Sequence, residues 1–67
     1  MRLTIESEEE ADGRWFAEIL ELLGVMSYGN TREDAVAAAQ ALAFRVIADR
    51  IEHGEAPALE SVAFVAA

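Results

Sequence analysis

The chain has 67 residues with 13 acidic residues, five Arg, no Lys and no Cys, and its formal net charge is −8 at pH 7. This length leaves room for one domain, residues 1–67, and the lack of Cys excludes a disulfide framework. The negative charge disfavours direct binding of nucleic acid phosphates.

Two alternating segments predict a β-hairpin near the N-terminus. Arg2–Ser7 places Leu3 and Ile5 on one side and polar residues on the other, as a half-buried strand does. Arg14–Ile19 alternates again. The acidic segment 8–13 between them ends in Asp-Gly and is typical of a turn.

The next segment predicts a short strand followed by one long helix. Val25–Tyr28 has strand character, and Gly29 with Asn30 is expected to break it. Thr31 is the expected N-cap, with Asp34 at the spacing of a capping box.

The end of this helix is also marked in the sequence. No Gly or Pro occurs between Glu33 and Glu52, and His53 lies in the predicted last turn, where a cation is favoured. Gly54 suits the left-handed position just beyond a helix. Capping explains the only His adequately without a catalytic role.

The predicted helix carries a broad apolar arc. Two adjacent stripes make it up: Ala35, Ala39, Leu42 and Val46 in one, and Val36, Ala43, Ile47 and Ile51 in the other. Phe44 lies at the margin, beside small residues. This arc is wider than one small sheet needs. The surplus either faces a second subunit or is an Ala-rich surface with good helix propensity.

One more strand is expected after the helix. Pro57 prevents further helix, and Leu59–Val65 is predicted as a last strand, either at an edge of the sheet or across a dimer. The fold class is therefore α+β: a two-layer β-β-β-α-β domain in which one long helix packs on one face of an antiparallel meander.

Three ordered motifs resemble the HicB-like antitoxin family. Asp12–Ile19 reads D-G-R-W-F-A-E-I, Gly24–Thr31 reads G-V-M-S-Y-G-N-T, and Glu33–Ala35 has the E-x-A opening of a helix. The similarity extends over roughly Leu3 to Gly54. It implies a partial ribonuclease-H-like β-β-β-α-β fold that associates through dimers.

The resemblance implies binding rather than catalysis. HicB-like antitoxins neutralise a small basic toxin that cleaves mRNA with a catalytic His, and a charge of −8 suits such a partner. Many members also carry a C-terminal DNA-binding segment. This chain has none before Ala67, so autoregulation by this chain alone is not expected. The alternative is a solitary dimeric or oligomeric domain of the same fold with another protein partner or a scaffolding role.

Aromatic and apolar residues are the candidates for a partner or oligomer interface. Trp15 and Phe16 alternate in one strand, so only one of them easily enters the core and the other is exposed in a monomer. Tyr28 can instead bury its ring and direct its hydroxyl at the turn. The complete candidate set is Trp15, Phe16, Glu18, Tyr28, Phe44, Ile51 and Phe64.

Acidic residues raise two further hypotheses. Glu8, Glu9, Glu10 and Asp12 form either a solvated turn or a loop that contacts a basic toxin. Glu6, Glu18 and Glu21 would be metal ligands in a metal-dependent nuclease, the least favoured function. The sequence contains no phosphate-binding Gly-rich loop and no Cys/His metal motif, so no cofactor, metal or catalytic residue is predicted.

Composition also bears on assembly and location. A small chain that is 54% hydrophobic is expected to bury apolar surface in a homodimer or higher oligomer. The N-terminus has no signal-peptide pattern and no apolar run approaches membrane-spanning length, so no membrane association and a cytoplasmic location are expected.

Overall fold

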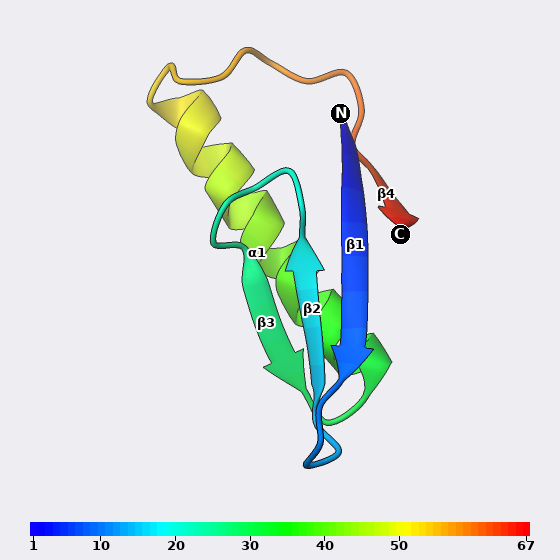
Figure 1. The fold of residues 1–67 in the computed structure, drawn as a ribbon. Coiled ribbons are helices and arrows are strands. Elements are labelled where there is room, and N and C mark those ends of the chain that lie inside the picture. The colour runs from blue at the N-terminus through cyan, green and yellow to red at the C-terminus, as the bar shows by residue number, and fades with distance from the viewer.

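A computed structural model describes residues 1–67 as a four-stranded sheet with one helix on one face (Figure 1). The elements are β1 (Arg2–Glu9), β2 (Trp15–Ile19), β3 (Met26–Gly29), α1 (Arg32–Glu52) and β4 (Ala63–Ala66). The sheet order is β3-β2-β1-β4. The predicted α+β class and the β-β-β-α-β element order are confirmed.

The hairpin between β1 and β2 extends further than the sequence predicted. Glu8 pairs with Phe16 and Glu9 with Trp15, so these two Glu belong to the strand and not to the turn. Both side chains are exposed although they point to opposite faces, and exposed strand positions tolerate charge, so the acidic run continues β1 instead of ending it. The turn is confined to residues 10–14, where Gly13 has a φ of 89°.

Residues of the sheet and the helix form one small core. Leu3, Ile5, Ala17 and Ile19 are buried on the helix-facing side of the sheet. Ala35, Ala39, Ala43 and Ile47 are the buried helix residues. Their spacing of four residues follows one helix face. Of the other predicted stripe residues, Val36, Leu42 and Val46 are half-buried, but Ile51 is exposed, because it lies in the last turn of the helix.

Both ends of α1 are capped as predicted. The Asp34 backbone N–H donates to Oγ1 of Thr31 at 3.1 Å. Beyond the helix, Gly54 has a φ of 71° and its N–H donates to the Ile51 carbonyl, while the Glu55 N–H donates to the Arg50 carbonyl at 2.8 Å. These two bonds form a Schellman motif, which satisfies carbonyls at the helix end.

The Thr31 cap gives a direct test of the helix start. Thr31→Ala leaves the Asp34 N–H without its side-chain acceptor and is expected to lower the free energy of unfolding by about 1 kcal/mol. Urea denaturation measures the loss. Thr31→Ser keeps the hydroxyl and is expected to stay near the wild-type value. Equal losses in the two variants would mean that the cap does not stabilise the helix.

The last strand is shorter than predicted and pairs within its own chain. β4 lies parallel to β1 at the edge of the sheet, with Leu3 beside Phe64 and Thr4 beside Val65. Residues 59–62 are outside the ladder. The long connection from the end of α1 returns the chain to the start of β1, which makes the parallel pairing possible (Figure 1).

Candidate functional site

The side of the sheet that faces away from α1 is uncovered, and we call it the open face (Figure 1). Because Leu3, Ile5, Ala17 and Ile19 point to the helix, their neighbours in each strand point the other way. The strand pairing places these residues on the open face: Arg2, Thr4, Glu6, Glu8, Phe16, Glu18, Met26, Tyr28, Ala63 and Val65.

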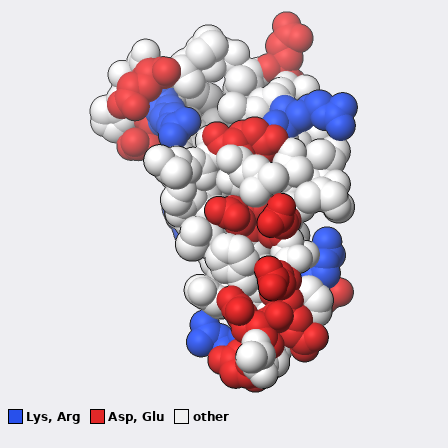
Figure 2. Space-filling model, in the orientation of Figure 1, with Lys and Arg blue, Asp and Glu red and all other residues white.

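Carboxylates are concentrated along this face. Glu6 lies directly opposite Glu18, and Glu8 follows two residues further along β1. Figure 2 shows acidic side chains continuing from the middle of the open face to the hairpin tip. No Arg side chain lies within ion-pair distance of a carboxylate; the one such contact of a carboxylate is with the imidazole of His53, whose Nδ1 lies 3.2 Å from Oδ1 of Asp49 in the last turns of α1. The acidic side chains of the open face therefore have no cationic partner within the chain.

The Glu6–Glu18 pairing is unfavourable for folding. Like charges directly opposite each other in an antiparallel pair are destabilising, on the scale of a few tenths of a kcal/mol to about 1 kcal/mol. Glu6 is exposed and Glu18 is half-buried, so burial of these side chains does not offset the repulsion between them. A surface that carries a charge pair unfavourable for folding is a candidate for binding, because such exceptions are expected at functional sites.

An aromatic cluster lies beside these carboxylates. Phe16 and Tyr28 are cross-strand partners, and their ring centroids are 5.5 Å apart. The Arg14 guanidinium carbon lies 4.6 Å from the centroid of the Tyr28 ring. Tyr28 is 50% exposed, so the expectation that its ring is buried at the turn is wrong. Aromatic residues surrounded by polar groups are typical anchors of protein interfaces.

The hairpin tip extends this cluster. The Arg14 backbone N–H donates to Oδ1 of Asp12 at 3.0 Å, and the Glu10 N–H donates to the Arg14 carbonyl at 2.7 Å. These bonds hold the tip in a defined turn. An open pocket there is lined by Glu10, Ala11, Asp12, Arg14 and Tyr28. The acidic run is thus divided between a β-strand and this tip.

Glu21 anchors the opposite end of the hairpin. Its carboxylate accepts hydrogen bonds from the Thr4 hydroxyl at 2.6 Å and from the Thr4 backbone N–H at 2.7 Å. The Leu20 N–H donates to the Thr4 carbonyl, as in an antiparallel pair. The Thr4 N–H, which a backbone carbonyl of a longer β2 would accept, is accepted by the Glu21 carboxylate instead. The Thr4 hydroxyl, and then its N–H, lower the pKa of Glu21 from its ordinary value of 4.5.

The lowered pKa of Glu21 predicts a pH-dependent contribution to stability. Because the folded state favours the carboxylate, the contribution is complete above pH 4.5 and is lost as the pH falls through the lower pKa of the folded protein. Wild type and Glu21→Gln are therefore expected to differ more in urea midpoint at neutral pH than in acid. Urea titrations across this range measure the difference, and a pH-independent difference would contradict the role of the carboxylate.

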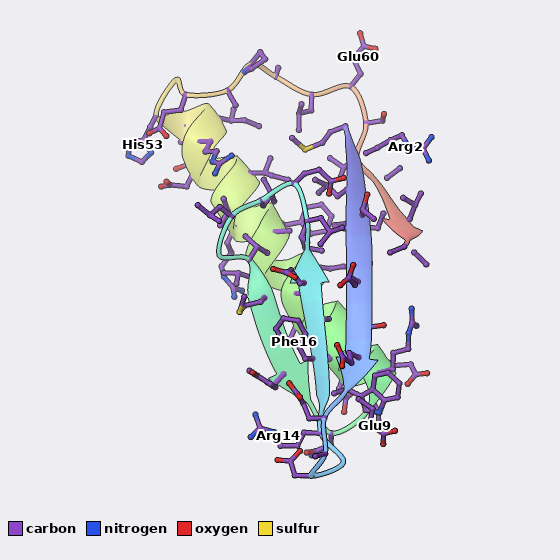
Figure 3. All side chains as sticks on the ribbon, viewed as in Figure 1. Arg2, Glu9, Arg14, Phe16, His53 and Glu60 are labelled. Carbon is purple, nitrogen blue, oxygen red and sulfur yellow. The ribbon has the colours of Figure 1, made fainter.

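The structure separates the seven predicted interface residues. Phe16, Glu18 and Tyr28 lie together on the open face. Trp15 faces the helix side and packs against the core, as strand alternation required for one of the two aromatic neighbours. Figure 3 shows Phe16 at the centre of the sheet.

The remaining three lie on the other side of the molecule. Phe44, 51% exposed on α1, packs edge-on against Phe64 of β4, with ring centroids 5.5 Å apart. Ile51 is on the same flank of the helix, seven residues beyond Phe44. Sequence reasoning missed Met26, Glu6 and Glu8 as members of one surface, although the alternation in β1 continues through Glu9 and is the signal that reveals it.

No group of three or more His, Asp and Glu side chains is placed to hold a metal ion. Glu6 and Glu18 are neighbours, but Glu21 is bound to Thr4. His53 caps α1, and its Nδ1 lies 2.8 Å from the Asp49 carbonyl. No helix of this structure combines the length and the apolar character that crossing a membrane requires.

Comparisons with protein-family models, curated proteins and solved structures found no match to this chain.

Proposed function

We propose that this chain is a protein-binding, antitoxin-like module that neutralises a small basic mRNA-cleaving toxin in the cytoplasm by masking its active surface. The observation that carries the proposal is the open face, where Glu6, Glu8 and Glu18 lie beside the half-buried Phe16 and the exposed Tyr28. The mechanism is binding: the toxin surface that would contact RNA phosphates contacts these carboxylates instead.

Charge and packing support this mechanism. A ribonuclease that holds RNA needs basic residues, and an acidic surface is complementary to them. The carboxylates have no cation of their own chain to displace, which lowers the cost of bringing in a new partner. The aromatic pair supplies apolar contact area at the centre, and the carboxylates form the rim.

The motifs that resemble HicB-like antitoxins lie in the same elements. The D-G-R-W-F-A-E-I segment forms the hairpin tip and β2, and the G-V-M-S-Y-G-N-T segment leads through β3 to the helix cap. Both segments contribute residues to the open face. The element order is also the order that the resemblance implies, which supports the proposal without depending on composition.

A second candidate is a solitary oligomeric domain with another protein partner or a scaffolding role. The exposed flank of α1 favours it, because Phe44 and Ile51 remain accessible there beside small residues. The two candidates differ in the partner. An antitoxin requires a small basic ribonuclease, while a scaffold does not.

Affinity capture from the source cell, followed by purification of the captured protein, tests the proposal. The expected partner is a small basic protein that cleaves RNA in vitro and loses this activity when the chain is added in equimolar amount. Glu8→Lys is expected to weaken inhibition at least about tenfold, because it places a cation on the surface that meets the toxin.

Glu60→Lys is the matched control, since it makes the same charge change in the connection that precedes β4, away from the hairpin tip (Figure 3). It is expected to inhibit like the wild type. If no basic ribonuclease is captured, or if both variants inhibit equally, the proposed use of the open face is wrong.

A further inference from the structure

The free edge of β4 is an unprotected pairing surface. The Ala63 N–H donates to the Met1 carbonyl at 2.8 Å and the Ala67 N–H to the Ile5 carbonyl at 2.9 Å, so alternate residues of β4 face β1. Phe64 and Ala66 therefore direct their backbone N–H and C=O groups outward. β4 contains no charged residue and no Pro, the usual features that prevent an edge from pairing.

Two residues of β1 with opposite charges, Arg2 and Glu6, lie next to β4 on the open face. Arg2 lies beside Ala63, and Figure 3 shows its side chain extending past the start of β4. Arg2 has no ion-pair partner in the chain. Glu6 lies four residues further along β1, and extending the β1–β4 register by one residue places it beside Ala67. It faces the like charge of Glu18.

We infer that two copies of this chain join through β4, in antiparallel pairing about a two-fold axis at Val65. Phe64 then pairs with the partner's Ala66, and Ala66 pairs with the partner's Phe64. Both residues satisfy their outward backbone groups in this arrangement. The two four-stranded sheets become one continuous sheet with no open β4 edge.

This register brings Arg2 into line with the partner's Glu6. The row across the interface is Arg2, Ala63, the partner's Ala67 and the partner's Glu6. Three strand spacings separate the outer two backbones, about 14 Å, which long Arg and Glu side chains can span above two small Ala. Two-fold symmetry forms the pair twice. Each partner Arg2 also supplies the cation that the Glu6–Glu18 pair lacks.

Other two-fold registers lose this complementarity. A shift that places Phe64 opposite the partner's Phe64 brings Arg2 into line with the partner's Thr4, which carries no charge. It also crowds two large rings directly opposite each other. In the inferred register each Phe64 lies beside a small Ala66 and diagonal to the other Phe64, within reach of an aromatic contact. The exposed Phe44 and the half-buried Phe64 that it contacts are then partly covered.

The opposite edge of the sheet is less suited to such pairing. β3 lies under α1, and at Gly29 the strand backbone approaches the backbone of the first helical turn too closely for any side chain.

The inferred interface does not rest on the proposed antitoxin function, because the β4 edge is separate from the Phe16–Tyr28 cluster at β2 and β3.

Sedimentation equilibrium over a concentration series tests the inference. The wild type is expected to approach twice the 7.3 kDa chain mass. Arg2→Glu and Glu6→Arg are each expected to weaken dimerisation about tenfold, since each replaces two attractive pairs by two repulsive ones. The double variant Arg2→Glu/Glu6→Arg reverses both partners and is expected to recover the wild-type dimer.

A backbone variant tests the edge itself. Ala66→Pro removes an outward N–H that β1 does not use and is expected to abolish the dimer, while Ala66→Val, of similar size, keeps this N–H and the dimer. Circular dichroism checks that each variant is folded. A monomeric wild type, no recovery in the double variant, or a dimer that survives Ala66→Pro would each overturn the inference.

Discussion

Gly29→Ala is expected to destabilise this protein by about 1–3 kcal/mol or more, although it adds only one methyl group. A Cβ at this position would lie 2.5 Å from the backbone nitrogen of Ala35 and 2.9 Å from the backbone carbon of Asp34. Both atoms belong to the first turn of α1. The methyl group can therefore be accommodated only if the helix moves away from β3.

This loss is a large part of the total free energy of unfolding of so short a chain, because that free energy is on the order of 0.05–0.15 kcal/mol per residue. Urea denaturation monitored by circular dichroism measures it. Gly13→Ala is the control, since Gly13 has a positive φ but no atom within 4 Å of the added Cβ. It is expected to cost about 1 kcal/mol through backbone strain alone. A smaller loss at Gly29 than at Gly13 would contradict the close approach.

Leu3→Ala is expected to have the largest effect in the core, a loss of about 3 kcal/mol or more in the free energy of unfolding. Leu3 is completely buried in β1 and is one of the two largest fully buried side chains. Truncation removes its apolar contacts and leaves a cavity between the sheet and the helix. With ten buried residues in the whole chain, few neighbours can rearrange to fill it.

Leu23→Ala is the matched control, because it makes the same chemical change at a side chain that is 99% exposed. Its expected effect on the free energy of unfolding, measured by urea denaturation, is within about 0.5 kcal/mol. The comparison separates the loss of core packing from the general effect of replacing Leu. Similar midpoints for the two variants would show that Leu3 is not central to the core.

The two largest effects differ in how far the sequence predicts them. Leu3 was recognisable from the alternation in its strand, since a buried face repeats every second residue. Gly29 was instead interpreted as a residue that ends β3, because Gly between a strand and a helix usually marks a turn. β3 does end at Gly29, and the structure adds what the pattern does not show: the absence of a side chain there allows the first turn of α1 to approach.

The candidate site was predicted only in pieces. Phe16, Glu18 and Tyr28 were expected at an interface, and the structure places them on one face. The local pattern suggests other roles for Glu6 and Glu8: a metal ligand for Glu6, and a solvated turn or a toxin-contacting loop for Glu8. Their proximity to Glu18 and Phe16 depends on the register between β1 and β2, which a local pattern does not specify.

The sequence by itself determined the element order and the helix with its caps, because these depend on periodicity and on residues within a few positions of each other. Only the tertiary structure decided that β4 lies parallel to β1, that the acidic side chains of β1 and β2 face one another, and that Phe44 contacts Phe64. These features join residues that are distant in the chain, and they arise from packing the helix on the sheet, which no single segment encodes.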